Sequence, residues 1–196
     1  MKKEGITLII LIVIFFLIAF NLKGEFLSKV NLSVNQLMSS IQFNPLIISS
    51  KIISNILETF GIILITLIFS AYLFLTKRKK ESIIFILIVG FSSITGLILK
   101  SIYHISRPAN ALISETDFSF PSGHSSIAVI FFGFLGYFLC KKYPKGKLLI
   151  STLSITGIFL VAFSRLYLNV HWFSDVIGGL ILGSIWMLIA LILLKK

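Results

Sequence analysis

The sequence has little cysteine, few acidic residues and no sign of a second domain. Of its 196 residues, 1 is Cys, 7 are Asp or Glu and 3 are His. A single cysteine, Cys140, excludes an internal disulfide framework. The chain has no evident repeat and no polar region that would form a soluble domain, so residues 1–196 are interpreted as one domain.

A cleavage site is also missing near the N-terminus. Lys2 and Lys3 precede an apolar run over residues 5–20, as in a secretory signal peptide, but no small-residue cleavage motif follows Phe20. The run is nearly as long as a bilayer span requires. We therefore expect it to be retained as the first transmembrane helix.

Apolar surface is what the sequence has in excess. Hydrophobic residues make up 57% of the chain and its mean hydropathy is +1.03, whereas soluble domains contain about 45–50% apolar residues. This composition predicts an integral membrane protein. The net charge of +11 would suggest nucleic-acid binding in a soluble chain, but the lysines lie at the ends of apolar runs, so no nucleic-acid partner is expected.

Six apolar runs alternate with polar or basic segments. They cover residues 5–20, 56–76, 82–99, 122–140, 148–163 and 176–194, and they predict an all-α fold with six transmembrane helices in one bundle. Residues 21–55 are too polar to span and are expected to form an outer loop, with an interfacial amphipathic helix followed by irregular chain. In the last run, Gly179 and Gly183 form a small-xxx-small pair that lets another helix approach closely.

The distribution of positive charge predicts the orientation in the membrane. Twelve of the 18 Lys and Arg residues lie at the two ends of the chain and in the turns after the second and fourth runs. Cytoplasmic loops of membrane proteins carry the excess of these residues. Both termini are therefore expected in the cytoplasm, and the remaining loops on the extracytoplasmic side of the cell membrane.

Three polar motifs occur where the runs begin or end on that outer side. They lie within residues 100–108, 121–124 and 164–175: Lys100 with Arg107-Pro108, Pro121-Ser122-Gly123-His124, and Ser164-Arg165 followed by His171 and Asp175. Ionisable groups at a membrane boundary are costly to place and usually face an interior site. We therefore expect the three motifs to meet at one membrane depth.

Each motif alone also has a purely structural interpretation. His171 and Asp175, four residues apart, fit either a buried pair or an imidazole whose second nitrogen acts as base or nucleophile. Ser122 would cap a helix and Gly123 would let an anion approach its start, although for this motif alone an ordinary helix start is the preferred interpretation. The cations of the first and third motifs fit either interfacial anchors or a phosphate site.

Together, the motifs favour phosphoryl transfer. Three cations match the charge that spreads over a phosphoryl group during its transfer. One histidine held by a carboxylate could attack phosphorus, and a second could protonate the departing oxygen. Such a set would hydrolyse a phosphate ester through a phosphohistidine, without a metal or other cofactor.

In residue type, order and spacing, the motifs resemble those of the type 2 phosphatidic acid phosphatase family of membrane lipid phosphatases. The resemblance implies that His171 is the nucleophile, Asp175 its orienting partner and His124 the general acid. It implies that five residues bind the phosphate: Lys100, Arg107, Ser122, Gly123 and Arg165. It also implies a lipid phosphate substrate, such as phosphatidylglycerol phosphate, phosphatidic acid or undecaprenyl pyrophosphate, with its tail in the bilayer and no obligate protein partner.

Two other functions remain open. A metal-binding transporter or hydrolase would use His124, His171, Asp175 and Asp117 as ligands, although three nearby cations would repel a metal ion. An anion transporter would need polar residues along a path through the spans, whereas here they cluster at one end.

Residues near the motifs are given structural roles. Glu115 and Asp117 are interpreted as solvated loop charges, which could also repel anionic headgroups and so tune specificity. Tyr103, Tyr167 and Trp172 are interpreted as an aromatic belt at the membrane interface.

Overall fold

The computed structural model describes residues 3–195, apart from the side chain of Thr59. Its helices are α1 (Lys3–Phe20), α2 (Glu25–Ser40), α3 (Asn44–Ile56), α4 (Thr59–Leu75), α5 (Lys79–Tyr103), α6 (Gly123–Lys142), the short 3₁₀ helix η1 (Pro144–Gly146), α7 (Lys147–Tyr167) and α8 (Phe173–Lys195). No strand occurs within residues 3–195, so the all-helical prediction is confirmed.

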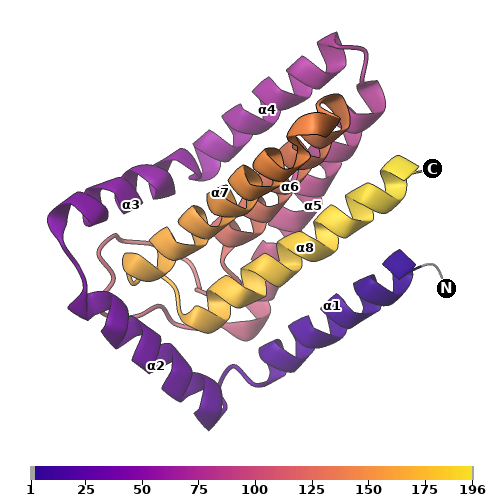
Figure 1. The fold of residues 1–196 in the computed structure, drawn as a ribbon. Helices are drawn as coiled ribbons and strands as arrows, with labels where there is room; N and C mark the ends of the chain where they lie inside the picture. The colour runs from indigo at the N-terminus through magenta and orange to yellow at the C-terminus, as the bar shows by residue number, and fades with distance from the viewer. Residues whose placement is uncertain (1–2, 196) are drawn as a thin grey trace.

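The long helices form one bundle with α6 at its centre (Figure 1). α6 packs against α5, α7 and α8, while α4 packs against α5 and α1 against α8. The helix α2 lies across one end of the bundle, where it contacts α7 and α8. The α5–α6 loop (104–122) and the α7–α8 loop (168–172) therefore lie together at that end.

Five regions are long and apolar enough to cross a membrane: α1, α5, α6, α7 with η1, and α8. The helices α3 and α4, bent by 59° at their junction, meet the same condition only as a pair, and this pair includes the second predicted span. Apolar side chains on the outside, such as Leu17, Phe60 and Leu148, are more than half exposed, as expected for surfaces that face lipid. The chain is therefore an integral membrane protein.

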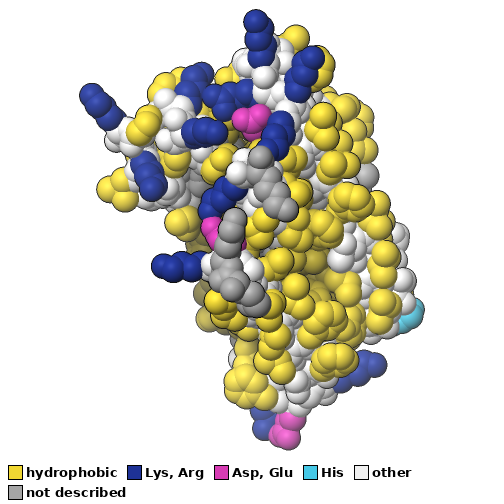
Figure 2. Space-filling view, turned by 90° about the vertical axis from the view of Figure 1, so that its right-hand side faces the viewer, with side chains coloured by type: hydrophobic (Ala, Val, Ile, Leu, Met, Phe, Trp, Pro, Cys, Tyr) yellow, Lys and Arg dark blue, Asp and Glu magenta, His cyan; other side chains and the backbone are white. Residues whose placement is uncertain are grey.

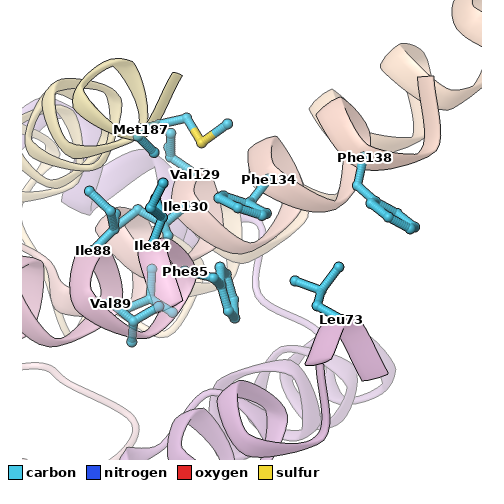
Figure 3. Close-up of a cluster of buried hydrophobic side chains, with 12 residues drawn as sticks. Leu73, Ile84, Phe85, Ile88, Val89, Val129, Ile130, Phe134, Phe138 and Met187 are labelled. Atoms are coloured by element: carbon cyan, nitrogen blue, oxygen red, sulfur yellow. The ribbon is translucent and has the colours of Figure 1, made fainter. Parts of the chain in front are cut away.

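A cluster of buried apolar side chains joins four of the helices (Figure 3). It includes Leu73 of α4, Phe85 of α5, Phe134 of α6 and Met187 of α8. The rings of Phe85 and Phe134 lie 5.1 Å apart between centroids. Because lipid tails are as apolar as these side chains, the cluster holds the helices together through close packing more than through exclusion of water.

Two glycines set the contact between α8 and the beginning of α6. A Cβ added to Gly179 would lie 2.3 Å from the carbonyl oxygen of Ser122, and one added to Gly183 would lie 2.4 Å from that of Ser126. No other residue type fits at either position without a backbone shift. The close approach predicted for this glycine pair is thus present, and it brings the Pro-Ser-Gly-His motif against the beginning of α8.

Residues 21–55 differ from the prediction, because two helices, α2 and α3, replace one helix and irregular chain. Tyr167, expected in an aromatic belt, is instead fully buried beneath the α2–α3 turn. Its hydroxyl donates to the carbonyl of Ile41 and accepts from the backbone N–H of Phe43, both at 2.9 Å. α2 also turns polar side chains inward, since Asn31 bonds Ser174 of α8. Tertiary contacts therefore decide the course of this segment.

Positive charge is concentrated at the end of the bundle away from α2. The two ends of the chain lie there with the α4–α5 and α6–α7 turns (Figure 1), and Lys195 forms an ion pair with Glu4. Figure 2 shows Lys and Arg side chains gathered at one end above a largely hydrophobic surface. The uneven distribution of Lys and Arg along the sequence thus corresponds to an excess of positive charge at one end of the bundle.

Candidate active site

The three motifs meet around one cavity at the α2 end of the bundle. Its volume is about 520 Å³, within the range of roughly 300–1,000 Å³ for ligand sites. Six of the eight predicted site residues line it: Lys100, Arg107, Gly123, His124, Arg165 and His171. The other two, Ser122 and Asp175, are wholly buried and are joined by a 3.0 Å hydrogen bond from the Ser122 N–H to the Asp175 carbonyl.

His171 lies in the loop before α8, and Asp175 lies in the first turn of that helix. The helix begins at Phe173, and Nδ1 of His171 is 3.4 Å from Oδ2 of Asp175. Nε2 of His171 is 3.3 Å from Nη1 of Arg107, and a guanidinium can only donate. Nε2 therefore carries a lone pair and Nδ1 carries the proton, which is the tautomer that a nucleophilic imidazole needs.

The start of α6 is capped and open toward the cavity. The side chain of Ser122 accepts a hydrogen bond from the backbone N–H of Ser125, so the predicted N-cap is confirmed. A Cβ added to Gly123 would meet nothing within 4 Å. Since the first N–H groups of a helix have no carbonyl one turn earlier, this open helix start has N–H donors available to an anion.

Three cations come to the cavity from separate elements. Lys100, in the last turn of α5, donates from Nζ to the carbonyl of Phe118 at 2.6 Å. Arg107, in the α5–α6 loop, donates from Nη1 to the carbonyl of Val170 at 2.8 Å. Arg165, in the last turn of α7, is fully buried. All three positive groups thus line the same cavity as the two histidines.

Glu115 and Asp117 do more than the solvated loop charges that we expected, because both pair with cations of the motifs, although Asp117 is exposed as expected and only Glu115 is largely buried. The carboxylate of Asp117 pairs with Nζ of Lys100 at 2.8 Å and with the guanidinium of Arg107. Glu115 pairs with Arg165 at 2.5 Å and lies 3.8 Å from Nη2 of Arg107. Both carboxylates therefore contact the cations of the motifs. The sequence offered one indication of these contacts, namely that Glu115 and Asp117 lie in the loop between two of the motifs.

Two titratable groups of the site lie in loops outside the helices. Burial raises the pKa of the Asp117 carboxyl, but hydrogen bonds from Lys100 and Arg107 outweigh it and hold that pKa below its usual value. Burial lowers the pKa of the His171 imidazole, and the charges of Arg165, Arg107 and Lys100 lower it further, so it lies well below its usual value. Asp117 is therefore ionised and His171 neutral near pH 7.

The rest of the cavity is apolar and runs between α4 and α5. Its lining here includes Ile63 and Leu67 of α4, and Val89, Gly90 and Leu97 of α5. Ile63, Leu67 and Leu97 are each more than half exposed, so the cavity reaches the lipid-facing surface of the bundle. One cavity therefore connects a cationic end with an apolar groove.

The four residues considered as metal ligands do not form a ligand set. Within the described part of the chain, no three His, Cys, Asp or Glu side chains are grouped as a metal ion would require. Asp117 contacts cations, and Asp175 accepts a 2.8 Å hydrogen bond from the backbone of Trp172 behind His171. The geometry therefore does not favour the metal-site alternative.

One further contact comes from a residue outside the motifs. Ser54, near the end of α3, is fully buried; its hydroxyl accepts from Nη1 of Arg165, and its carbonyl oxygen lies 3.1 Å from Nε2 of His124. The sequence around it, an ordinary mixture of serine, asparagine and isoleucine, gives no signal of this contact.

Two curated proteins with similar sequences are phosphatases by name. The chain is 35% identical over 120 residues to phosphatidylglycerophosphatase B of Bacillus subtilis, covering 59% of each chain. It is 32% identical over 123 residues to undecaprenyl-diphosphatase of Sulfolobus acidocaldarius, covering 59% of this chain and 56% of the relative. The similarity thus spans less than two thirds of either relative.

The fold also matches a solved structure. It aligns over 100% of this chain and 98% of the other, with a TM-score of 0.90 and 25% identity, to the crystal structure of a transmembrane PAP2 type phosphatidylglycerolphosphate phosphatase from Bacillus subtilis. The family model of the PAP2 superfamily matches residues 81–196, which contain all three motifs. By this match, the chain belongs to the PAP2 superfamily.

Proposed function

We propose that this protein is a membrane lipid phosphatase that removes phosphate from a lipid phosphate or pyrophosphate, by way of a phosphohistidine, on the extracytoplasmic side. Family membership and the phosphatases among its relatives support this reaction class. The position of six motif residues around one cavity also supports it.

The observation that carries the proposal is the shape of the cavity. Its polar end contains Lys100, Arg107, Arg165 and two imidazoles, whereas its apolar part opens between α4 and α5 toward the lipid. A phosphorylated lipid has the same two parts, an anionic headgroup and a hydrocarbon tail. A water-soluble phosphate would leave the apolar groove unused.

The reaction begins with the lone pair on Nε2 of His171, which bonds to phosphorus as the bond to the leaving oxygen breaks. Asp175, 3.4 Å from Nδ1, stabilises the positive charge that the ring acquires. His124, doubly protonated in the substrate complex, gives a proton to the leaving oxygen. Water then attacks the phosphohistidine and returns a proton to His124, so inorganic phosphate leaves and His171 is neutral again.

The cations and the start of α6 stabilise the charge on the transferring group. Lys100, Arg107 and Arg165 surround the position of the phosphoryl oxygens, and the open backbone at Gly123 adds N–H donors. Such a fixed electrostatic environment contributes most of the acceleration in many enzymes. We infer no cofactor for this reaction.

The proposed orientation places both termini in the cytoplasm and the site outside, with six spans if α3 and α4 cross together. The basic turns and the chain ends lie at one end of the bundle, and the cavity lies toward the other. An excess of Lys and Arg on the cytoplasmic side is the general rule for membrane proteins.

The substrate class is taken from the chemistry and from the relatives. Phosphatidylglycerol phosphate, phosphatidic acid and undecaprenyl pyrophosphate all join a phosphate to a long tail, and two relatives are named for the first and third of these lipids. The proposal requires no protein partner, only the substrate and the bilayer.

The experiment is release of inorganic phosphate from a panel of these three lipids by the purified protein in detergent. We expect turnover on at least one lipid, and His171→Ala and His124→Ala should each lower kcat by two orders of magnitude or more. Brief incubation with a ³²P-labelled substrate should label the wild-type chain in an acid-labile, base-stable form, as expected for a phosphohistidine.

His104→Ala is the matched control, because His104 ends α5 nearby but does not line the cavity. It should keep near-normal activity. Near-normal activity of both His171→Ala and His124→Ala in folded protein would contradict the mechanism. Uptake of phosphate into proteoliposomes without hydrolysis would favour the transporter alternative instead.

A further inference from the structure

The helix α3 reaches the active site from outside the part of the chain that matches the family model. It covers Asn44–Ile56, whereas the match begins at residue 81. It packs along α7, and Ser54, in its last turn, is fully buried. A residue with no place in the motifs thus lies between two site residues, Arg165 and His124.

The hydroxyl of Ser54 holds one side of the Arg165 guanidinium. It accepts from Nη1, while Nη2 donates to Glu115 on the other side. Nε of Arg165 is buried with no hydrogen-bond partner. Because each buried unsatisfied N–H of a charged group is costly, the Ser54 hydroxyl stabilises the guanidinium in this position.

The carbonyl of Ser54 determines the tautomer of His124. Its oxygen lies 3.1 Å from Nε2, and a carbonyl can only accept, so Nε2 carries a proton. Nδ1 is then the ring nitrogen that gains and loses the transferable proton. A backbone carbonyl on one imidazole nitrogen is a common way to orient a catalytic histidine.

The junction between α3 and α4 makes this carbonyl available. α3 ends at Ile56 and the chain bends by 59° before α4, so the Ser54 carbonyl lies in the last turn, where it accepts one hydrogen bond from the N–H of Leu57 at 3.1 Å and keeps its second lone pair for His124. A Cβ added to Gly61 would lie 2.0 Å from the Ile56 carbonyl oxygen. Only glycine allows the two helices to meet this closely, so the bend is encoded in the sequence.

We propose that Ser54 is a positioning residue for the phosphatase reaction, because its hydroxyl holds Arg165 against the phosphate and its carbonyl holds the ring of His124 with the proton on Nε2. The inference rests on the proposed function. It extends the active site to a helix that precedes the residues of the family match.

The test compares Ser54→Ala and Ser54→Cys with the wild-type chain. Both variants lack a good hydroxyl acceptor, and cysteine nearly preserves the volume. We expect the Ki for orthovanadate, a phosphate analogue, to rise about tenfold or more, the usual effect of losing a hydrogen bond to a charged group. The KM for a lipid phosphate should rise with it, and kcat should fall.

Ser50→Ala is the matched control. Ser50 lies one helical turn earlier on α3, is equally buried, and is bonded to neither Arg165 nor His124. It should leave KM and the vanadate Ki unchanged. Normal kinetics in Ser54→Cys, or equal losses in Ser50→Ala and Ser54→Ala, would reduce Ser54 to a packing role and overturn the inference.

The outcome separates this inference from the proposed function. If the wild-type chain hydrolyses no lipid phosphate, the proposed function fails, but vanadate binding measured by thermal stabilisation still tests the contact between Ser54 and Arg165. If the wild-type and Ser50→Ala chains are active and Ser54→Ala equals them in kinetics and vanadate affinity, only the inference about Ser54 fails.

Discussion

Each cation of the site contacts a carboxylate of the α5–α6 loop in this structure. Asp117 pairs with Lys100 and Arg107, and Glu115 pairs with Arg165. An arriving phosphate must therefore compete with charges that belong to the protein. This competition weakens the net binding of the phosphate. In return, the carboxylates keep the three cations paired when no phosphate is bound, and unpaired charge near the bilayer is costly.

Asp117→Asn should strengthen phosphate binding, because it removes the competing charge and keeps the shape of the side chain. The ion pairs are partly exposed, so the expected change is modest, with the Ki for inorganic phosphate lower by about twofold to fivefold. Inhibition of lipid hydrolysis by phosphate measures it, with Asp117→Glu as the charge-preserving control. A higher Ki in Asp117→Asn would mean that Asp117 holds the cations in place.

The pH dependence at the acid side follows from His171. Its pKa in the folded protein lies well below 6.5 because of burial and the nearby cations, whereas in the unfolded chain it should titrate near 6.5. Its neutral form is therefore kept in the folded protein from high pH down to well below 6.5. The stability that it contributes is present above pH 6.5 and is lost as the pH falls through the folded pKa.

We expect the acid limb of kcat/KM from His171 to lie well below pH 6.5, after correction for the substrate phosphate, which titrates near pH 6. Kinetics from pH 4 to 8, with the melting temperature recorded at each pH, would separate titration from unfolding. A limb centred at pH 6.5 or above in folded protein would show that His171 is not held neutral as described.

At the scale of elements, the contact between α6 and α8 matters most for the site. It holds the helix start at Gly123 against the helix start at Asp175, through the close approach at Gly179 and Gly183. The positions of His171 and of the helix start at Gly123 therefore depend on a packing contact along two spans, and not only on their own loops.

Gly183→Ala should separate these helices, because its Cβ would lie 2.4 Å from the Ser126 carbonyl oxygen. Overpacking of this kind costs about 1–3 kcal/mol. The melting temperature in detergent should fall, and kcat should fall even where the protein stays folded. Gly5→Ala, where an added Cβ meets nothing within 4 Å, is the control and should change neither quantity.

At the scale of the whole molecule, the sequence was sufficient for the long apolar helices and for six of the residues lining the cavity, but not for α3. The spans can be predicted from the sequence because a helix that crosses lipid needs a long apolar run. The motifs can be predicted because the residues of each one are close together in the chain. The roles of Ser54, Glu115 and Asp117 were not predicted, because they depend on how distant segments approach in space. The inward polar face of α2 was missed because a polar helix face can meet protein as well as water.

The opening of the apolar groove to the side, between α4 and α5, has a consequence for selectivity. In the proposed substrate complex, only the hydrocarbon nearest to phosphorus would lie within the protein, and the remainder of a long tail would stay among neighbouring lipids. The length of the lipid tail, and double bonds far from the headgroup, would then contribute the same free energy before and after the substrate binds. Selectivity between substrates would then depend on the atoms next to the scissile bond. Short-chain, detergent-soluble analogues would therefore be sufficient to measure the substrate preference.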